Sequence, residues 1–416
     1  MKKVLSILIA TTFLLCLCAC NNSTDEYSSA EVEIIYEDVE TVYDNENAVN
    51  SIEQSSSQKG EVISSDTSNQ NNSFTTNETT ENTFQLNDTA TLQKIKLNGR
   101  CEKTQEGISL NMAASAIEFN TNSSSVMVEV DTSSTIYYTV MVDGEITMQH
   151  EPIESQGKNY VIIARGLGSG SHNIKFIRDG ESRANLEFTV ASIQLDDGAT
   201  LLARDGDKKV IEFLGDSLTS GFGNLALNST YEPSNLKYMS STKAYPFLIA
   251  NKLGFDYRIV SMSSIALGKR EEYPTFSEFY SLENYHNDKT KKYASSNPQD
   301  VDIVVVNLGT NDVGSKLYDA KNYQSVSEYE QLFTDLITNI GYRKDAKIVF
   351  ITGVWNPEPI TAINGAITKL KSQGYNDVYS LTVKECKSGG GSHPSEKEHT
   401  EIADAIENFF KTNGII

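Results

Sequence analysis

Residues 209–224 read KVIEFLGDSLTSGFGN and decide how the second half of the chain folds. The apolar run that ends at Leu214 suits a buried strand, and it stops at the polar turn Gly215-Asp216-Ser217. A serine in such a turn most often serves the turn itself, because small polar residues fit tight backbone geometry. Whether Ser217 is instead a nucleophile depends on what the rest of the chain brings to the same place.

Strand-like and helix-like segments alternate after residue 207. The expected strands are VIEFL, YRIVSM, DIVVVN, KIVFIT and DVYSL, and the expected helices cover about 242–254, 326–341, 359–373 and 395–412. The last helix begins at Ser395 with Glu398 three residues later, which is a capping box. It should bury Ile402, Ala403, Ile406 and Phe409. Apolar strands separated by helices predict a parallel sheet covered on both faces, in a three-layer α/β domain of flavodoxin-like type.

A different pattern fills residues 89–204. Period-two apolar spacing recurs in SVMVEVD, TIYYTVMVDGEITM, NYVIIARG, HNIKFIRDGE and NLEFTVASIQL. The pairs Asp143-Gly144 and Asp179-Gly180 fall between such runs, where tight hairpin turns require positive φ angles. Short strands at this spacing predict a β-sandwich or jelly roll ahead of the α/β domain, which then covers residues 205–416.

The N-terminal segment indicates export. A short basic start is followed by VLSILIATTFLLCLCAC, which has the form of a signal peptide over residues 1–20. Its end, Leu17-Cys18-Ala19-Cys20, resembles a bacterial lipobox, which implies lipidation of Cys20, membrane anchoring and an extracellular location on a bacterial cell surface. An ordinary cleavage site with incidental cysteines is the alternative.

The composition is polar and acidic between the signal peptide and the first strands. Residues 21–88 are rich in Ser, Asn, Thr and Glu and predict a disordered linker. Residues 21–90 hold 15 Asp and Glu against one Lys, so this segment supplies −14 of the net charge of −21. The remainder is only mildly acidic, which argues against nucleic acid as a partner. Cys101 and Cys386 are the two cysteines after Cys20, and they could form a disulfide or remain buried thiols.

The carboxyl ends of the expected parallel strands gather polar residues at one edge of the sheet, where ligands of open α/β sheets bind. These positions are Ser217, Ser263 and Ser264, then Gly309, Thr310, Asn311 and Asp312, then Trp355 and Asn356, and finally His393 before the last helix. A serine, an asparagine and a histidine at one edge are the parts for acyl transfer: nucleophile, oxyanion donor and general base.

GDSL at 215–218, GTND at 309–312 and HP at 393–394 resemble, in order, the sequence blocks of the GDSL or SGNH hydrolases. The resemblance covers about residues 207–416 and implies that Ser217 is the nucleophile and His393 the general base. It also implies an oxyanion hole formed by the backbone N–H of Ser217, the side chain of Asn311 and the backbone N–H of Ser264. The family has glycine at the last position, but any residue except proline supplies that N–H.

A second departure concerns the histidine. Most family members place an Asp three residues before it, and this chain has Gly390 there. We therefore predict a Ser217–His393 dyad, in which a backbone carbonyl or a distant carboxylate orients the imidazole. Asp216 and Asp312 are expected to be structural and to hydrogen-bond the loops around the site.

The two-domain layout narrows the resemblance. A β-sandwich joined to a GDSL domain, with LNGRCEKTQEGISLNMAASAIEF near the sandwich start, resembles the second family of carbohydrate esterases. That family removes acetyl groups from plant polysaccharides such as xylan and glucomannan. Trp355 and Gly309 are the expected substrate contacts, although Trp355 could equally pack in the core.

The expected function is therefore a lipid-anchored carbohydrate O-acetyl esterase acting on an acetylated polysaccharide or oligosaccharide. Acetylated bacterial wall polymers and short-chain lipid esters are alternative substrates. A surface glycan-binding lipoprotein with a vestigial hydrolase domain is the alternative class. The remaining histidines are His150, His172, His286 and His399. No metal-ligand spacing connects them, so we expect neither a metal nor a cofactor.

Overall fold

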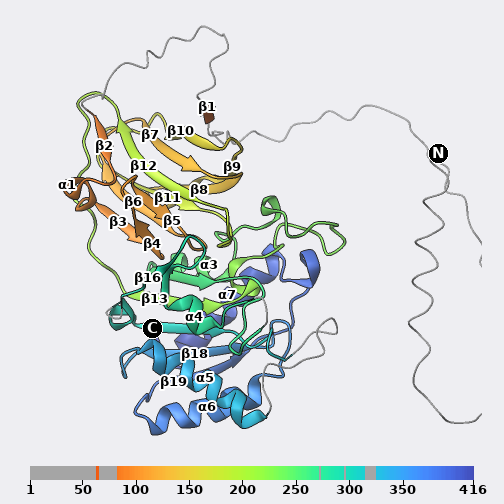
Figure 1. The fold of residues 1–416 in the computed structure, drawn as a ribbon. Helices are drawn as coiled ribbons and strands as arrows, with labels where there is room; N and C mark the ends of the chain where they lie inside the picture. The colour runs from red at the N-terminus through yellow and green to blue at the C-terminus, as the bar shows by residue number, and fades with distance from the viewer. Residues whose placement is uncertain (1–61, 65–81, 271–272, 295–296, 314–324) are drawn as a thin grey trace, which may run out of the picture. The chain divides into compact units, whose positions relative to one another are not determined.

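The computed structural model describes residues 62–64, 82–270, 273–294, 297–313 and 325–416 (Figure 1). The predicted signal peptide, the lipidation site Cys20 and most of the predicted linker lie outside these residues. Within the described residues, no helix combines the length and the apolar character needed to cross a membrane.

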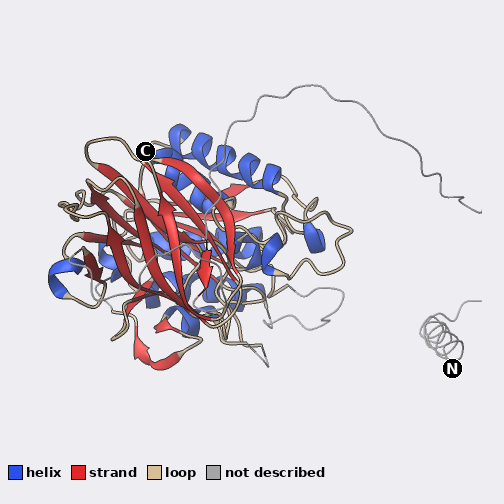
Figure 2. Cartoon of the chain, turned by 90° about the horizontal axis from the view of Figure 1, so that it is seen from above, coloured by secondary structure: helices blue, strands red, loops and turns tan. Residues whose placement is uncertain are grey.

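The first domain packs two antiparallel sheets against each other, as predicted (Figure 2). One sheet has the order β1 (Val62–Ser64), β10 (Gly157–Ala164), β7 (Val126–Thr132), β12 (Phe188–Leu195), β5 (Ile108–Leu110) and β4 (Cys101–Lys103), with β2 (Thr83–Gln85) also paired to β12. The other has the order β3 (Ile95–Asn98), β6 (Ala116–Thr121), β11 (His172–Arg178), β8 (Ile136–Val142) and β9 (Glu145–Ile153). Their inward-facing apolar residues form one shared core.

Two details of this domain differ from the prediction. The domain begins before residue 89, because β2 pairs with β12, Leu86 is fully buried and Asp88 caps the short helix α1 (Thr89–Leu92). This short strand stands in a polar stretch, so its few apolar residues give little periodic signal. Asp143 and Gly144 form the predicted hairpin turn between β8 and β9, both with positive φ. Asp179-Gly180 does not form a hairpin, since β11 and β12 lie in different sheets.

The second domain contains the predicted parallel sheet. Its strands are β13 (Val210–Gly215), β14 (Asp256–Ser261), β17 (Ile303–Asn307), β18 (Lys347–Thr352) and β19 (Val378–Thr382). Their order is β14-β13-β17-β18-β19, and every pair is parallel. This is the flavodoxin-like order, in which the chain reverses direction beside its first strand and leaves a crevice at the strand ends.

Helices cover both faces of the parallel sheet. The long helices are α3 (Tyr245–Leu253), α5 (Val326–Ile340), α6 (Ile360–Ser372) and α7 (Glu396–Thr412). Alternate residues of β17 enter opposite cores, Val304 on the α5–α6 side and Val305 on the α3–α7 side. The capping box of Ser395 and Glu398 is present at the start of α7. Phe410, rather than the predicted Phe409, is the fully buried phenylalanine of α7, because it lies one turn beyond the buried Ile406.

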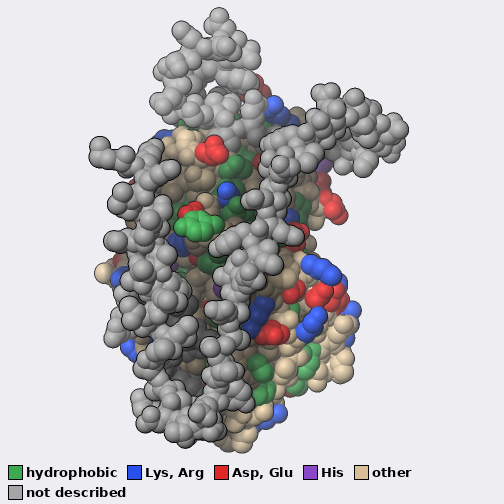
Figure 3. Space-filling view, turned by 90° about the vertical axis from the view of Figure 1, so that its right-hand side faces the viewer, with side chains coloured by type: hydrophobic (Ala, Val, Ile, Leu, Met, Phe, Trp, Pro, Cys, Tyr) green, Lys and Arg blue, Asp and Glu red, His purple; other side chains and the backbone are tan. Residues whose placement is uncertain are grey.

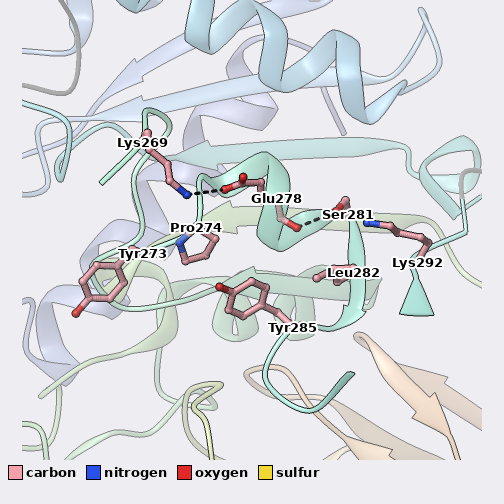
Figure 4. A pocket seen from close by; sticks show the side chains of 8 residues that line it. All are labelled: Lys269, Tyr273, Pro274, Glu278, Ser281, Leu282, Tyr285 and Lys292. Carbon is pink, nitrogen blue, oxygen red and sulfur yellow. Dashed lines mark hydrogen bonds and ion pairs between the residues drawn. The ribbon is translucent and has the colours of Figure 1, made fainter. Parts of the chain in front are cut away.

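The shorter elements of this domain lie among its loops. They are α2 (Ser217–Ser220), α4 (Phe276–Tyr280), the hairpin of β15 (Leu282–Asn284) and β16 (Asp288–Lys292), and the 3₁₀ turns η1 (Leu236–Tyr238), η2 (Asn297–Asp300) and η3 (Gly390–Ser392). A cavity of about 430 Å³ lies beside α4 and this hairpin (Figure 4). It is lined by Lys269, Tyr273, Pro274, Glu278, Ser281, Leu282, Tyr285 and Lys292. None of the predicted site residues lines it.

The two domains share a buried contact made by Arg100 of the sandwich. Arg100 is 1% exposed, and its Nη1 donates to the carbonyl oxygens of Tyr280 (2.8 Å) and Leu282 (3.0 Å). Its guanidinium also lies 4.4 Å and 3.6 Å from the ring centroids of Tyr280 and Tyr293. A buried cation enclosed in this way requires both domains to be in place.

The visible part of one face of the molecule carries charged side chains of both signs. On the face drawn in Figure 3, the visible basic and acidic side chains lie close to one another, without a continuous basic field.

Candidate active site

Ser217 stands at the carboxyl end of β13, where the chain turns directly into α2. A Cβ atom on Gly215 would come within 1.8 Å of Thr219 Oγ1, so only glycine permits a turn this tight. Asp216 then caps the helix by accepting a hydrogen bond from the Leu218 N–H at 2.9 Å. Ser217 is partly exposed between buried neighbours, and its hydroxyl is therefore accessible at the sheet edge.

His393 reaches the same point from the loop before α7. Its Nε2 lies 2.8 Å from Ser217 Oγ, and its Nδ1 lies 2.9 Å from the carbonyl oxygen of Gly391. Because a carbonyl can only accept, Nδ1 carries the proton and Nε2 accepts from the serine hydroxyl. This is the tautomer that a general base requires. The partner of Nδ1 is a backbone carbonyl, which is one of the two alternatives predicted for this position.

Two aromatic rings enclose the imidazole of His393. The Phe222 ring centroid lies 4.5 Å from that of His393, and the Trp355 centroid lies 5.5 Å away. Burial lowers the pKa of His393 below its usual 6.5, against the opposing effects of the Gly391 hydrogen bond and the charge of Glu181. Phe222 and Glu181 were not predicted. Phe222 is inside the GDSL stretch itself, five residues after the serine, and its aromatic character in a polar turn was the available signal.

Asn311 lies beside this pair but is already hydrogen-bonded. Its Nδ2 donates to Asp216 Oδ2 at 3.1 Å and to the carbonyl oxygen of Ile265 at 2.9 Å. Asp216 is fully buried, and this burial, together with the nearby charge of Asp312, raises the pKa of Asp216 to about 7. The structure thus places Asn311 at the sheet edge, with its amide held by Asp216 and by the loop that contains Ser264.

That loop follows β14 and is held by Asp312. The carboxylate of Asp312 accepts hydrogen bonds from the backbone N–H groups of Leu267 (3.0 Å) and Gly268 (2.8 Å). The expected structural roles of Asp216 and Asp312 are therefore confirmed. Ser264 has a φ of +65°, in the left-handed region that favours glycine. A glycine would adopt this conformation without the strain that a Cβ atom brings.

The two predicted substrate contacts differ in their surroundings. Trp355 follows β18, packs partly against the α3–α7 core and places its ring beside His393. Its packing against the core is confirmed, and its substrate contact stays a prediction. Gly309 is buried, and its carbonyl accepts a hydrogen bond from Tyr329 at 2.7 Å. A Cβ atom there would come within 2.3 Å of the Tyr329 hydroxyl, which favours a packing role over the predicted substrate contact.

The other histidines and the two cysteines of the described residues do not belong to the Ser217–His393 pair. Within the described residues, Cys101 and Cys386 are unpaired thiols rather than a disulfide. His150 contacts Asp179 at 2.9 Å, and His399 accepts a hydrogen bond from the backbone N–H of Tyr245 at 3.2 Å. Both contacts are structural.

Comparison with protein families finds two adjacent matches. The model described as "Carbohydrate esterase 2 N-terminal" matches residues 97–204, and the GDSL-like lipase/acylhydrolase family model matches residues 213–388. The boundary between the matches coincides with the end of the sandwich. The chain therefore carries an ester hydrolase domain of the GDSL type and is a carboxylic ester hydrolase.

Individual relatives agree with this division. An acetylxylan esterase/glucomannan deacetylase from Cellvibrio japonicus is 26% identical over 261 residues, which cover 58% of this chain and 69% of that protein. The structure of a family two carbohydrate esterase from Clostridium thermocellum in complex with cellohexaose superimposes with a TM-score of 0.67 at 20% identity, covering 77% of this chain and 100% of that one. An acetyl xylan esterase from Butyrivibrio proteoclasticus gives 0.70 at 17% identity, covering 80% and 99%. The two structural matches confirm the two-domain fold.

Proposed function

Starting from a chain that joins a carbohydrate esterase 2 N-terminal domain to a GDSL-type hydrolase domain, we propose that this protein removes O-acetyl groups from carbohydrates. The observation that carries the proposal is the 2.8 Å contact between His393 Nε2 and Ser217 Oγ at the sheet edge. It is supported by the activities printed in the names of the Cellvibrio and Butyrivibrio relatives, both of them acetyl esterases on xylan. Acetylated xylan and glucomannan are the substrates that we propose first.

The proposed reaction uses a Ser–His dyad. Ser217 Oγ attacks the acetyl carbonyl carbon while its proton passes to His393 Nε2. The imidazolium keeps its Nδ1–H on the Gly391 carbonyl and then protonates the sugar oxygen as the ester bond breaks. A water molecule, deprotonated by His393, next attacks the acetyl-serine, releases acetate and restores the serine hydroxyl.

The oxyanion of each tetrahedral intermediate needs donors on the other side of Ser217. We propose the backbone N–H groups of Ser217 and Ser264 and the Nδ2 of Asn311. The Asn311 amide is held by Asp216 at 3.1 Å and Ile265 at 2.9 Å, so one of its N–H groups has to be shared with the oxyanion. Donors fixed in advance in this way stabilise developing charge without reorganisation.

Acetate release tests the proposal. The wild-type protein should release acetate from acetylated xylan or glucomannan, and Ser217→Ala should reduce the rate by about 10³-fold or more. Ser372→Ala is the matched control, because Ser372 is an exposed serine at the end of α6. Failure of the wild type to release acetate from any acetylated glycan or aryl acetate would overturn it.

Two alternatives are separated in the same experiment. Faster release from acetylated peptidoglycan, or from short-chain lipid esters, would assign those substrates to the same Ser217 chemistry. Retention on a glycan column by both the wild type and Ser217→Ala, without turnover, would favour the glycan-binding protein with a vestigial hydrolase domain. Gly390 and Ser264 are the departures from the family pattern that keep this second alternative in view.

We also propose that the protein is exported and anchored to a bacterial membrane through lipidated Cys20. The support is the sequence pattern of residues 1–20 alone. Metabolic labelling with a fatty-acid analogue should mark the full-length protein and not the Cys20→Ser variant. Equal labelling of both would refute the anchor.

A further inference from the structure

A loop of the β-sandwich reaches the catalytic edge of the hydrolase domain. This loop joins β11 to β12 and includes Glu181, which is 1% exposed. Glu181 Oε2 accepts hydrogen bonds from Ser220 Oγ (3.3 Å) and from Ser263 Oγ, while Oε1 pairs with Arg183. Ser220 belongs to the helix that begins at the nucleophile, and Ser263 directly precedes Ser264. One carboxylate from the first domain therefore joins helix α2, which begins at Ser217, to the loop that follows β14 in the second domain.

The segment held by Glu181 is strained. Ser264 has a φ of +65°, a left-handed conformation that is unfavourable for a residue with a Cβ atom. Such a conformation persists only where its surroundings enforce it. Two contacts do so here: Arg270 Nη1 donates to the Ser264 carbonyl at 2.7 Å, and Ser263 is tied to Glu181. The β-sandwich thus helps to hold Ser264 in a backbone conformation that glycine would adopt without strain.

We propose that Glu181 is a positioning residue that the β-sandwich supplies to the active site, where it holds Ser263 and thereby aims the Ser264 N–H at the oxyanion. The inference rests on the proposed function, because it assigns the oxyanion to the same site. It gives the sandwich a part in catalysis that does not require the sandwich to bind sugar.

Charged groups surround Glu181 on several elements. Arg183 and the Arg178 guanidinium lie on the sandwich side; Arg178 Nη2 donates to the Glu181 carbonyl at 2.9 Å. On the hydrolase side His286 and His393 both experience the Glu181 charge. Burial and the charge of Arg178 lower the pKa of His286 to about 4, so His286 is neutral at neutral pH. Loss of the Glu181 charge should lower the pKa of His393 further, because that charge favours the imidazolium.

A structural role in joining the domains is the competing explanation, and Asp179 provides its control. Asp179 lies two residues away in the same loop, is equally buried and accepts hydrogen bonds from Ser240 and Thr242 of the hydrolase domain. Asp179→Asn therefore weakens the domain contact without touching Ser263. Glu181→Gln removes the charge that ties Ser220 and Ser263 together.

The experiment compares these variants by turnover of an aryl acetate and by the rate at which a fluorophosphonate labels Ser217. Glu181→Gln should lower kcat and the labelling rate by about tenfold or more while KM stays within about twofold, since a displaced oxyanion donor affects the transition state alone. It should also move the acid limb of the pH profile to lower pH. Asp179→Asn should lower the melting temperature and leave these quantities unchanged. Equal effects of the two variants on kcat and on the acid limb would overturn the proposal.

Variants within the hydrolase domain test the same link if Glu181→Gln does not fold. Ser263→Ala should reproduce the loss in kcat, and combining it with Glu181→Gln should cost little more, because both variants disrupt the same contact between Ser263 and Glu181. Ser264→Gly relieves the strain, so Glu181→Gln should cost less than about threefold in that background. A fully additive double variant, or an undiminished loss in the Ser264→Gly background, would contradict the positioning role. Fluorophosphonate labelling needs no natural substrate, and so it distinguishes failure of this inference from failure of the proposed function.

Discussion

His393 Nδ1 and the carbonyl oxygen of Gly391 lie 2.9 Å apart, so the chain orients its imidazole with its own backbone two residues away. A carbonyl fixes the tautomer as a carboxylate would, but it carries no full charge to stabilise the imidazolium. Gly390 is the position from which an aspartate could orient the imidazole instead, so the space around Gly390 decides whether this chain could accommodate that carboxylate.

Introducing that carboxylate at residue 390 should fail. A Cβ atom on Gly390 would come within 2.7 Å of the Cβ atoms of Ala226 and Pro233. Gly390→Asp should therefore lose about 1–3 kcal/mol of stability and gain no activity. Thermal unfolding and kcat measure this, with Gly390→Ala as the control for bulk without charge. A Gly390→Asp variant that melts with the wild type and turns over faster would contradict the packing argument.

The acid limb of kcat/KM should lie below pH 6.5. Burial lowers the pKa of His393, and the neutral imidazole is the active base, so activity persists to more acidic pH than a solvated histidine would allow. Rates on a soluble aryl acetate from about pH 4 to about pH 8 give this limb. Phe222→Ala should hydrate the ring and move the limb toward pH 6.5. A wild-type limb at or above 6.5 would show that burial does not control His393.

Removing the Asn311 amide tests the oxyanion donor. Asn311→Ala should reduce kcat by about 10²–10³ with little change in KM, because the lost hydrogen bond forms chiefly in the transition state. Steady-state kinetics on an aryl acetate measures both constants. A loss of less than about tenfold would mean that Asn311 serves Asp216 and the Ile265 carbonyl alone.

The folded protein should lose stability in mild acid through His399. Burial lowers the pKa of this histidine to about 3, and its Nδ1 accepts the Tyr245 N–H, which only the neutral ring can do. The unfolded chain binds the proton from about pH 6.5 downward. Stability is therefore complete above pH 6.5 and falls by up to about 1.4 kcal/mol per pH unit as the pH decreases toward 3.

Urea unfolding at neutral pH and near pH 5 measures that slope. His399→Gln cannot take up the proton and should show a shallower decrease than the wild type. His286, with its pKa lowered to about 4, contributes in the same direction and remains in both proteins. Identical slopes for the two proteins would remove His399 from this role.

The parallel sheet and the gathering of polar residues at its edge can be predicted from the sequence, because each strand is apolar throughout and ends at a polar turn. Parallel strands bring those turns together whatever the intervening loops do, so Ser217 and His393 meet although 176 residues separate them. The sequence could predict a backbone carbonyl as one candidate acceptor of the Nδ1–H, but it could not identify Gly391, since every residue has a backbone carbonyl.

Contacts between the domains could not be predicted in this way. Glu181 stands in a stretch that reads as an ordinary turn beside Asp179-Gly180, and nothing in its spacing points to Ser263. Its role depends on how two separately patterned domains pack, which periodicity within each does not encode. The contact of Phe222 with His393 could not be predicted for a related reason, because the two residues are close in space but far apart in the sequence.

The contacts of Arg100 argue against expressing the two domains of this enzyme separately. Its guanidinium belongs to the first domain, but the carbonyl groups and the rings of Tyr280 and Tyr293 that enclose it belong to the second. A hydrolase domain expressed alone would leave that cage empty, and a chimera carrying a foreign sandwich would need an arginine at the same place. Gene fusions that move this catalytic domain into other proteins should therefore transfer both halves as one cassette, with added modules attached before the sandwich or after α7.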